Sequence, residues 1–134
     1  MRKLTLALLL ILGLAACRQE KNEPSLIASL QGTWELRTTS GFPGNINYPP
    51  GNGILLKFLP GSIVESWDGG RMLSRNTFAL KPRKDCIGTD VKMAVFNVFT
   101  EGNYNFLSLN GDQLTLFTPN CFADGGMSAY ERLR

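Results

Sequence analysis

Histidine is absent from the 134 residues of this sequence. The absence excludes Ser–His and Cys–His nucleophile pairs and the usual histidine general base. Carboxylates could supply an acid–base pair of the kind that glycosidases use, but no spacing singles out two of them. The carboxylates considered are Glu35, Glu65, Asp68, Glu101 and Asp124. We therefore expect that the protein is not an enzyme and needs no cofactor.

Long apolar runs are also absent, except near the N-terminus. There, a predominantly apolar stretch from Leu4 to Leu12 follows Arg2 and Lys3, and small residues lead from it to Cys17. This three-part layout is typical of a secretory signal. The run is shorter than the roughly 20 apolar residues that a transmembrane helix needs. We therefore expect residues 1–16 to be a cleaved signal peptide rather than a membrane span.

The residues Leu14-Ala15-Ala16-Cys17 resemble the lipobox of bacterial prolipoproteins, in which the cysteine becomes a lipidated N-terminus. The resemblance implies an acylated Cys17, and two acyl chains suffice to hold a domain at a membrane. Arg18 to Pro24 are mostly polar and lack apolar periodicity, so residues 17–24 should form the lipidated cysteine and a flexible tether. In well-studied enterobacterial lipoproteins, an aspartate directly after the lipidated cysteine resembles an inner-membrane retention signal. This chain has Arg18 at that position. This favours the outer membrane, on its periplasmic or cell-surface face.

The rest of the chain has no large excess of either positive or negative charge. Of the 14 basic and 11 acidic residues, Arg2 and Lys3 fall in the signal, so the mature chain has a net charge of about +1. No basic run with interleaved aromatic residues is present, and such runs are what neutralise phosphates. We therefore expect no nucleic-acid partner. Residues 25–134 are long enough for one domain with one core.

Cysteine is scarce too, with three in the whole sequence. If Cys17 carries lipid, Cys86 and Cys121 remain as an even pair in an oxidising compartment, and we predict that they form a disulfide. A bridge that closes this loop of about 35 residues would stabilise the fold by about 3 to 4 kcal/mol. The alternatives are two free thiols or a metal site. A metal is disfavoured, because two thiolates without histidine do not complete a zinc shell.

Short runs of β-branched, aromatic and aliphatic residues are separated by Gly, Asn, Asp and Pro, and long amphipathic helices are missing. Connections such as Pro60-Gly61 and Asn110-Gly111-Asp112 are typical of tight turns, because Gly and Asn adopt positive φ at little steric cost. Neighbouring strands should therefore form antiparallel hairpins. The eight predicted strands are Gln31–Thr39, Gly53–Leu59, Ser62–Trp67, Arg71–Leu80, Val91–Phe99, Tyr104–Leu109, Gln113–Thr118 and Met127–Leu133.

Two segments fall outside this strand pattern. Ser25 to Leu30 should form a helical turn that plugs one barrel end, with Ser25 as its N-cap. Ser40 to Asn52 is longer than a hairpin requires and carries Phe42 and Tyr48. Such a segment is either a lid over a barrel mouth or a packed surface loop.

Eight sequential antiparallel strands predict an all-β fold, an up-and-down barrel, because closure removes both sheet edges. The residues Gly32-Thr33-Trp34 resemble the Gly-x-Trp signature of lipocalins and their calycin relatives. Arg132, on the last predicted strand, resembles the basic residue that packs across the tryptophan in those families. The resemblance implies that a guanidinium covers the Trp34 indole, caps carbonyls of the entering turn and closes the barrel bottom.

More narrowly, the order of motifs resembles that of lipocalin-like lipoproteins found in Bacteroidetes. After Gly32-Thr33-Trp34 come a Gly/Pro loop, Asn110 to Leu114, Asp124-Gly125-Gly126 and Tyr130-Glu131-Arg132. The resemblance spans nearly the whole mature chain, although its motifs are short. It implies a lipocalin-like fold and a central cavity for a small hydrophobic compound.

A barrel of eight strands holds either one small ligand or a packed interior. Alternation along the strands predicts an inward direction for Trp34, Leu36, Leu56, Phe58, Val95, Leu107, Leu109, Leu114, Leu116 and Tyr130. The candidate ligand-binding residues are Leu36, Phe42, Tyr48, Leu56, Phe58, Val95, Leu107, Leu116 and Tyr130. The function is then either a lipid-anchored carrier of a small hydrophobic ligand or a tethered structural module that contacts protein or glycan. Exposed aromatic residues such as Trp67, Phe42 and Tyr48 would favour the second.

Overall fold

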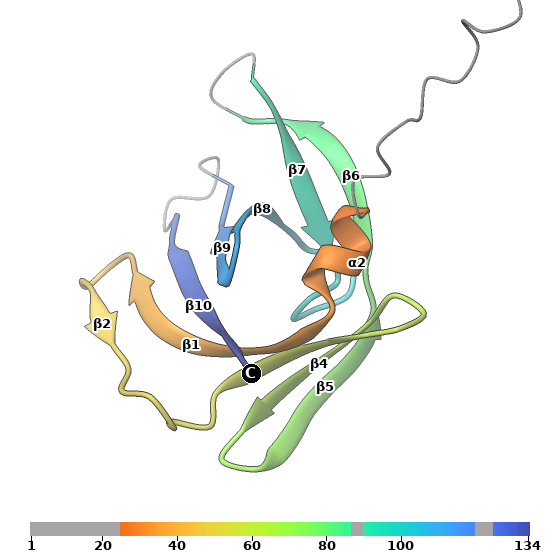
Figure 1. Cartoon of the computed structure of the whole chain (residues 1–134). Coiled ribbons are helices and arrows are strands. Elements are labelled where there is room, and N and C mark those ends of the chain that lie inside the picture. The colour runs from red at the N-terminus through yellow and green to blue at the C-terminus, as the bar shows by residue number, and fades with distance from the viewer. Residues whose placement is uncertain (1–24, 87–89, 120–124) are drawn as a thin grey trace, which may run out of the picture.

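The computed structural model describes residues 25–86, 90–119 and 125–134. The predicted signal (1–16) and tether (17–24) lie outside the described residues, as do Cys121 and Asp124. Within the described ranges the fold is all-β, with ten strands in one curled antiparallel sheet and one short helix (Figure 1). The predicted fold class, an antiparallel β fold, is confirmed at this level.

The sheet runs in the order β5-β4-β3-β1-β10-β9-β8-β7-β6, and β2 pairs with β1 off this path. The elements are α2 (Leu26–Leu30), β1 (Gly32–Ser40), β2 (Ile46–Asn47), β3 (Leu55–Leu59), β4 (Ile63–Asp68), β5 (Arg71–Thr77), β6 (Ala79–Lys84), β7 (Val91–Phe96), β8 (Tyr104–Asn110), β9 (Gln113–Phe117) and β10 (Met127–Leu133). All strand pairs are antiparallel, and the first and last strands are neighbours, with Trp34 opposite Arg132. This pairing curls the sheet into at least a half-barrel.

Each of the eight predicted strands has a counterpart, but two details of the prediction are wrong. The expected strand Arg71–Leu80 is divided, because β5 ends at Thr77 and β6 begins at Ala79. Phe78 lies between them and donates its backbone N–H to the carbonyl of Ser62 at 2.8 Å. Its ring is buried edge-on against Phe58, with centroids 5.1 Å apart. The core contact and this hydrogen bond together break the strand. The second detail is β2, which the sequence did not indicate.

The inner face of the sheet is filled with apolar side chains. All ten residues predicted to point inward belong to this core, although Leu107 and Leu109 are only partly buried. The remaining members of the cluster include Leu30, Val64, Phe78 and Val98. The alternation of side chains along the strands therefore predicted the core correctly.

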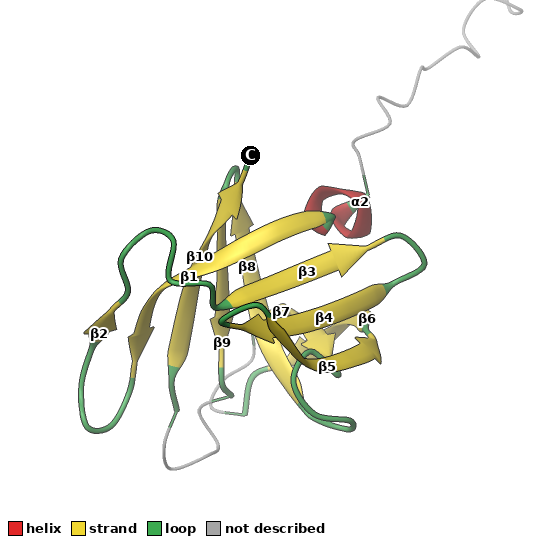
Figure 2. Ribbon diagram, turned by 90° about the horizontal axis from the view of Figure 1, so that it is seen from below, coloured by secondary structure: helices red, strands yellow, loops and turns green. Residues whose placement is uncertain are grey.

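The predicted helical turn is present as α2, and Figure 2 shows it next to the start of β1 and the end of β3. Ser25 caps it, because its hydroxyl accepts a hydrogen bond from the backbone N–H of Ala28 at 3.2 Å. Leu30 is completely buried in the core cluster. The helix therefore covers this end of the curled sheet.

The segment from Ser40 to Asn52 is a mostly exposed loop that is tied to β1 and, through Tyr48, to the core. Its central residues form β2 on the edge of β1, and Tyr48 donates its N–H to the carbonyl of Arg37 at 2.8 Å. The Tyr48 ring packs against the core. Phe42, in contrast, is 92% exposed at the tip. The chain therefore directs Tyr48 and not Phe42 toward the core, and a ligand-binding role of Phe42 stays a prediction.

Candidate functional site

The corner between α2, β1 and β10 brings together the two residues of the predicted signature. The Arg132 guanidinium carbon lies 4.1 Å from the centroid of the Trp34 ring. The same guanidinium donates to the carbonyls of Gln31 and Ser29, at 2.6 and 2.7 Å. The Trp34 indole N–H donates to the carbonyl of Leu30 at 2.8 Å. One cation therefore covers the indole and also satisfies carbonyls at the C-terminal end of α2.

Gly32 is required by the geometry of this corner. Its φ is +133°, a value that side-chain-bearing residues rarely adopt, and an added Cβ would lie 2.8 Å from Nη1 of Arg132. The glycine of the Gly-x-Trp motif therefore leaves space for the guanidinium that covers Trp34. Asp112 also belongs to this corner, since it forms ion pairs with both Arg132 and Arg134.

All candidate ligand-binding residues except Phe42 belong to the core or pack against it. Leu36, Leu56, Phe58, Val95 and Leu116 are each at most 5% exposed and pack against one another in the core. Burial raises the pKa of Tyr130 to about 12, which keeps its hydroxyl neutral within this core. The observed packing is that of a filled interior.

Two pockets, of about 360 and 350 Å³, instead lie along β8 and meet at Thr118. The first is lined by Asp85, Lys92, Phe106, Leu107, Ser108, Phe117 and Thr118. Phe106 and Ser108 alternate with the core residues Leu107 and Leu109, so this pocket opens on the outer side of the sheet. Of the predicted ligand-binding residues, Leu107 alone is in its described lining.

A buried carboxylate on β1 holds the loop that precedes β3. The side chain of Glu35 is 3% exposed, and it accepts hydrogen bonds from the N–H groups of Gly51 and Gly53 at 3.0 and 3.3 Å. Arg37 pairs with Glu35 and also with the exposed Glu131. Burial alone would raise the pKa of Glu35, but the hydrogen bonds from Gly51, Arg37 and Gly53 outweigh it, and the pKa is lowered.

We expect Glu35→Gln to lower the free energy of unfolding by about 1 to 2 kcal/mol near neutral pH, because an amide cannot accept from all three donors. The folded-state pKa is lowered, so this stabilisation is present above the ordinary glutamate pKa of about 4.3 and is lost as the pH falls through the folded pKa. Urea unfolding from about pH 7 down to about pH 3 should show the two proteins converging in acid. Glu131→Gln is the control. An equally large loss of stability in Glu131→Gln would contradict the proposal that the hydrogen bonds of Glu35 to the loop are stabilising.

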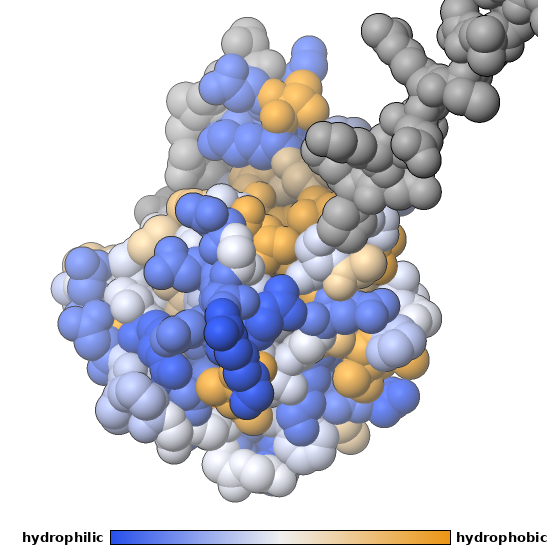
Figure 3. All heavy atoms as spheres, in the orientation of Figure 1, coloured by the Kyte–Doolittle hydropathy of each residue, from blue (hydrophilic) through white to orange (hydrophobic). Residues whose placement is uncertain are grey.

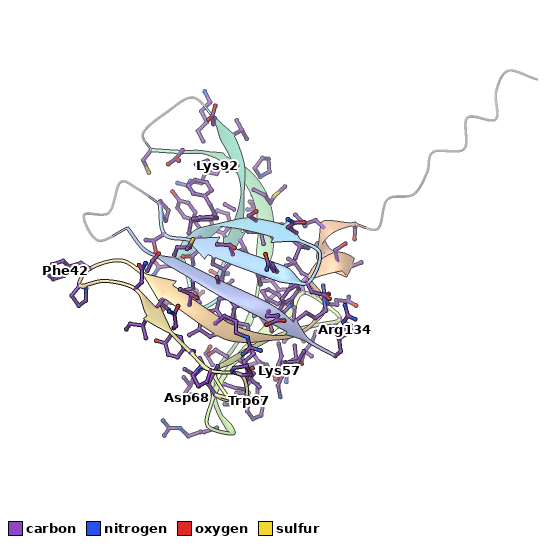
Figure 4. The ribbon with its side chains drawn as sticks, turned by 60° about the vertical axis from the view of Figure 1, so that its left-hand side comes forward. Phe42, Lys57, Trp67, Asp68, Lys92 and Arg134 are labelled. Atoms are coloured by element: carbon purple, nitrogen blue, oxygen red, sulfur yellow. The ribbon has the colours of Figure 1, made fainter. Side chains whose placement is uncertain are left out.

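Another aromatic contact lies on the outer face of β3 and β4. The Lys57 ammonium is 3.9 Å from the centroid of the Trp67 ring, and the Trp67 indole N–H donates to Glu65 at 2.9 Å. Glu65 is also paired with Arg75. Figure 4 shows Lys57, Trp67 and Asp68 gathered at the same end of the molecule. Lys57 covers one face of the indole and Glu65 accepts from its N–H, so the Trp67 side chain is held against the outer face of the sheet.

The carboxylates considered for catalysis are not assembled into one site by the described residues. Glu35 and Glu65 are each paired with a different arginine. Glu101 lines a small pocket of about 230 Å³ with Asn76, Thr77 and Asn97. The described ranges contain no cluster of His, Cys, Asp or Glu that could hold a metal ion.

Comparisons with known proteins add no assignment. No protein-family model, no curated protein and no solved structure matches this chain. Within the part of the chain that the structure describes, no helix is long and apolar enough to cross a membrane. The functional argument therefore depends on the geometry of the chain itself.

Proposed function

We propose that this chain is a membrane-anchored lipoprotein with a lipocalin-like barrel whose interior is filled, and that it acts as a tethered structural or interaction module. The signal-like segment, the lipobox-like residues up to Cys17 and the polar tether support the anchor. The outer membrane is the expected location. The corner formed by Gly32, Trp34 and Arg132 supports the lipocalin-like barrel.

We infer closure of the barrel from the way β5 and β6 are joined. A single residue, Phe78, separates them, and they stand at the two ends of the strand order. If they are counted as one bent strand and β2 is set aside, the path contains eight strands. It then returns to its start, because one half of the bent strand pairs with β4 and the other half with β7. This supports an eight-stranded barrel.

The filled interior is the observation that carries the choice of function. Leu36, Leu56, Phe58, Val95 and Leu116 were candidates to line a ligand cavity, yet they are buried against one another. A carrier of a hydrophobic compound normally keeps a cavity of at least about 300 Å³ for its ligand. The alternative, a carrier, is favoured by the two pockets along β8, of which the first lies beside Phe106 and Lys92 on the outer face.

Mass spectrometry of the mature protein, purified from bacterial membranes in mild detergent, tests both parts of the proposal. The N-terminal peptide should carry the mass of a lipidated Cys17, which tests the anchor. Native and denaturing spectra of the whole protein should agree, because a filled barrel holds no ligand. An adduct that is reproducibly lost on unfolding would instead establish the carrier, and an unmodified Cys17 would refute the anchor.

A further inference from the structure

The β6–β7 hairpin projects beyond the rest of the sheet (Figure 1). β6 and β7 pair along their whole length, from Ala79–Phe96 to Lys84–Val91. β7 pairs with β8, however, only over Ala94–Phe96. The outer half of the hairpin, with its cross-strand pairs Pro82–Met93, Arg83–Lys92 and Lys84–Val91, therefore extends past the ladder. We call this half the overhang.

One face of the overhang carries apolar side chains together with Lys84, the cross-strand partner of Val91. Cross-strand partners share a face, and Val95 with its partner Leu80 points into the core, so Met93 and Val91 lie on that same side. Val91 is 60% exposed, and Met93 is half-buried. Pro82 is opposite Met93 and is exposed. The core-side face of the sheet thus continues into solvent as an uncovered apolar strip.

The other face of the overhang is basic. Arg83 and Lys92 are cross-strand partners there, and Lys81 precedes them on the same face. The Arg83 guanidinium lies 4.3 Å from the centroid of the Tyr104 ring, and Lys92 is paired with Asp85 at 2.7 Å. Including Lys84, the hairpin carries four cationic side chains against the two acidic ones of Asp85 and Asp90. Its charge is therefore positive while the mature chain is nearly neutral.

The apolar strip lies on the face of the molecule where the described chain begins. Figure 3 shows apolar surface gathered between the β6–β7 hairpin and α2. Ile27 of α2, which is 39% exposed, adds to the apolar character of α2. The seven residues from Arg18 to Pro24 span at most about 25 Å when fully extended. A lipid on Cys17 would therefore keep α2 and the strip close to the bilayer.

We propose that the overhang is a second membrane contact, which docks the domain on a bilayer containing anionic lipid. Val91 and Met93 enter the interface between headgroups and acyl chains, and Lys84, the cross-strand partner of Val91 on the same face, meets anionic headgroups. The long aliphatic stem of Lys84 lets its ammonium reach the headgroups from the apolar face. This contact rests on the proposed lipid anchor, which limits the distance from the bilayer. It fixes which face of the domain is turned away from the membrane.

Hydrogen exchange on the lipidated protein in vesicles tests the contact. We expect amides of residues 79–86 and 90–96 to exchange roughly tenfold more slowly on vesicles with phosphatidylglycerol than on vesicles of phosphatidylcholine alone. Lys84→Glu, and separately Val91→Ser, should bring exchange on the two kinds of vesicle to within about twofold. Arg71→Glu is the matched control, because Arg71 is an exposed cation on β5. Figure 4 places Asp68, its cross-strand partner, far from Lys92.

Equal exchange on both kinds of vesicle would overturn the contact, as would an effect of Arg71→Glu as large as that of Lys84→Glu. The anchor is tested separately by the mass of the N-terminal peptide. If that peptide carries no lipid, the same chain is sedimented with each kind of vesicle. Sedimentation with anionic vesicles alone, abolished by Lys84→Glu, would then support the contact without the anchor, and its absence would overturn the contact.

Discussion

Replacing Arg132 with alanine is expected to lower the free energy of unfolding by about 3 kcal/mol. The guanidinium makes charge-assisted hydrogen bonds to the carbonyls of Gln31 and Ser29, and it covers the Trp34 ring. Its loss leaves these carbonyls without that donor and removes the cation–π contact. Urea unfolding at neutral pH, followed by the fluorescence of the two tryptophans, measures the change.

Two variants distinguish the contribution of the Arg132 contacts from the effect of simply removing a positive charge. Arg132→Lys keeps the cation but loses the planar fork, so we expect it to recover less than half of the lost stability. Arg134→Ala removes a neighbouring arginine that is 84% exposed and pairs with the same Asp112. It should have no measurable effect, because exposed ion pairs contribute little. If Arg132→Ala were as mild as Arg134→Ala, the corner would not be a major source of stability.

The sequence predicted the corner because its geometry depends on residues that are recognisable without a fold. Gly32 and Trp34 lie two residues apart at the start of a strand, and Arg132 follows the last predicted turn. The strands and the core were predictable for a similar reason. Alternation has a period of two residues, and turn residues mark where it stops.

The features that the sequence did not reveal depend on contacts between distant segments. The division at Phe78 requires the carbonyl of Ser62 and the ring of Phe58, neither of which is near it in the chain. Burial of Glu35 requires the loop amides of Gly51 and Gly53. Taken alone, Glu35 is an ordinary charged residue on a strand, and its role depends on the path of that loop.

The overhang is hidden from the sequence in the same way. Val91 and Met93 alternate like any strand that faces a core, so the pattern alone places them inside. Whether they are covered depends on how far the ladder between β7 and β8 extends, and it stops at Ala94. A candidate site can therefore consist of residues whose pattern predicts only packing.

Removing the predicted disulfide is expected to cost about 3 to 4 kcal/mol of unfolding free energy, as the chain-entropy model gives for a loop of this length. Cys86 lies two residues after the end of β6, and its N–H donates to Asp85, which pairs with Lys92 of β7. Cys121 falls between β9 and β10 in the sequence, outside the described residues. The bridge would thus tie the end of the overhang to the connection between the last two strands.

The test compares the double variant Cys86→Ala/Cys121→Ala with each single variant and with the parent protein under reducing agent. If the two cysteines are bonded, the parent has a mass two protons below that of its reduced form, and the three variants lose similar stability, because either substitution breaks the same bond. Reduction should lower the stability of the parent by the same amount and leave the double variant unchanged. Additive losses in the single variants, or a parent mass without the deficit, would mean that the cysteines act separately. Among the described contacts, the overhang would then be held by its pairing within the hairpin, the short ladder to β8 and the contact of Arg83 with Tyr104.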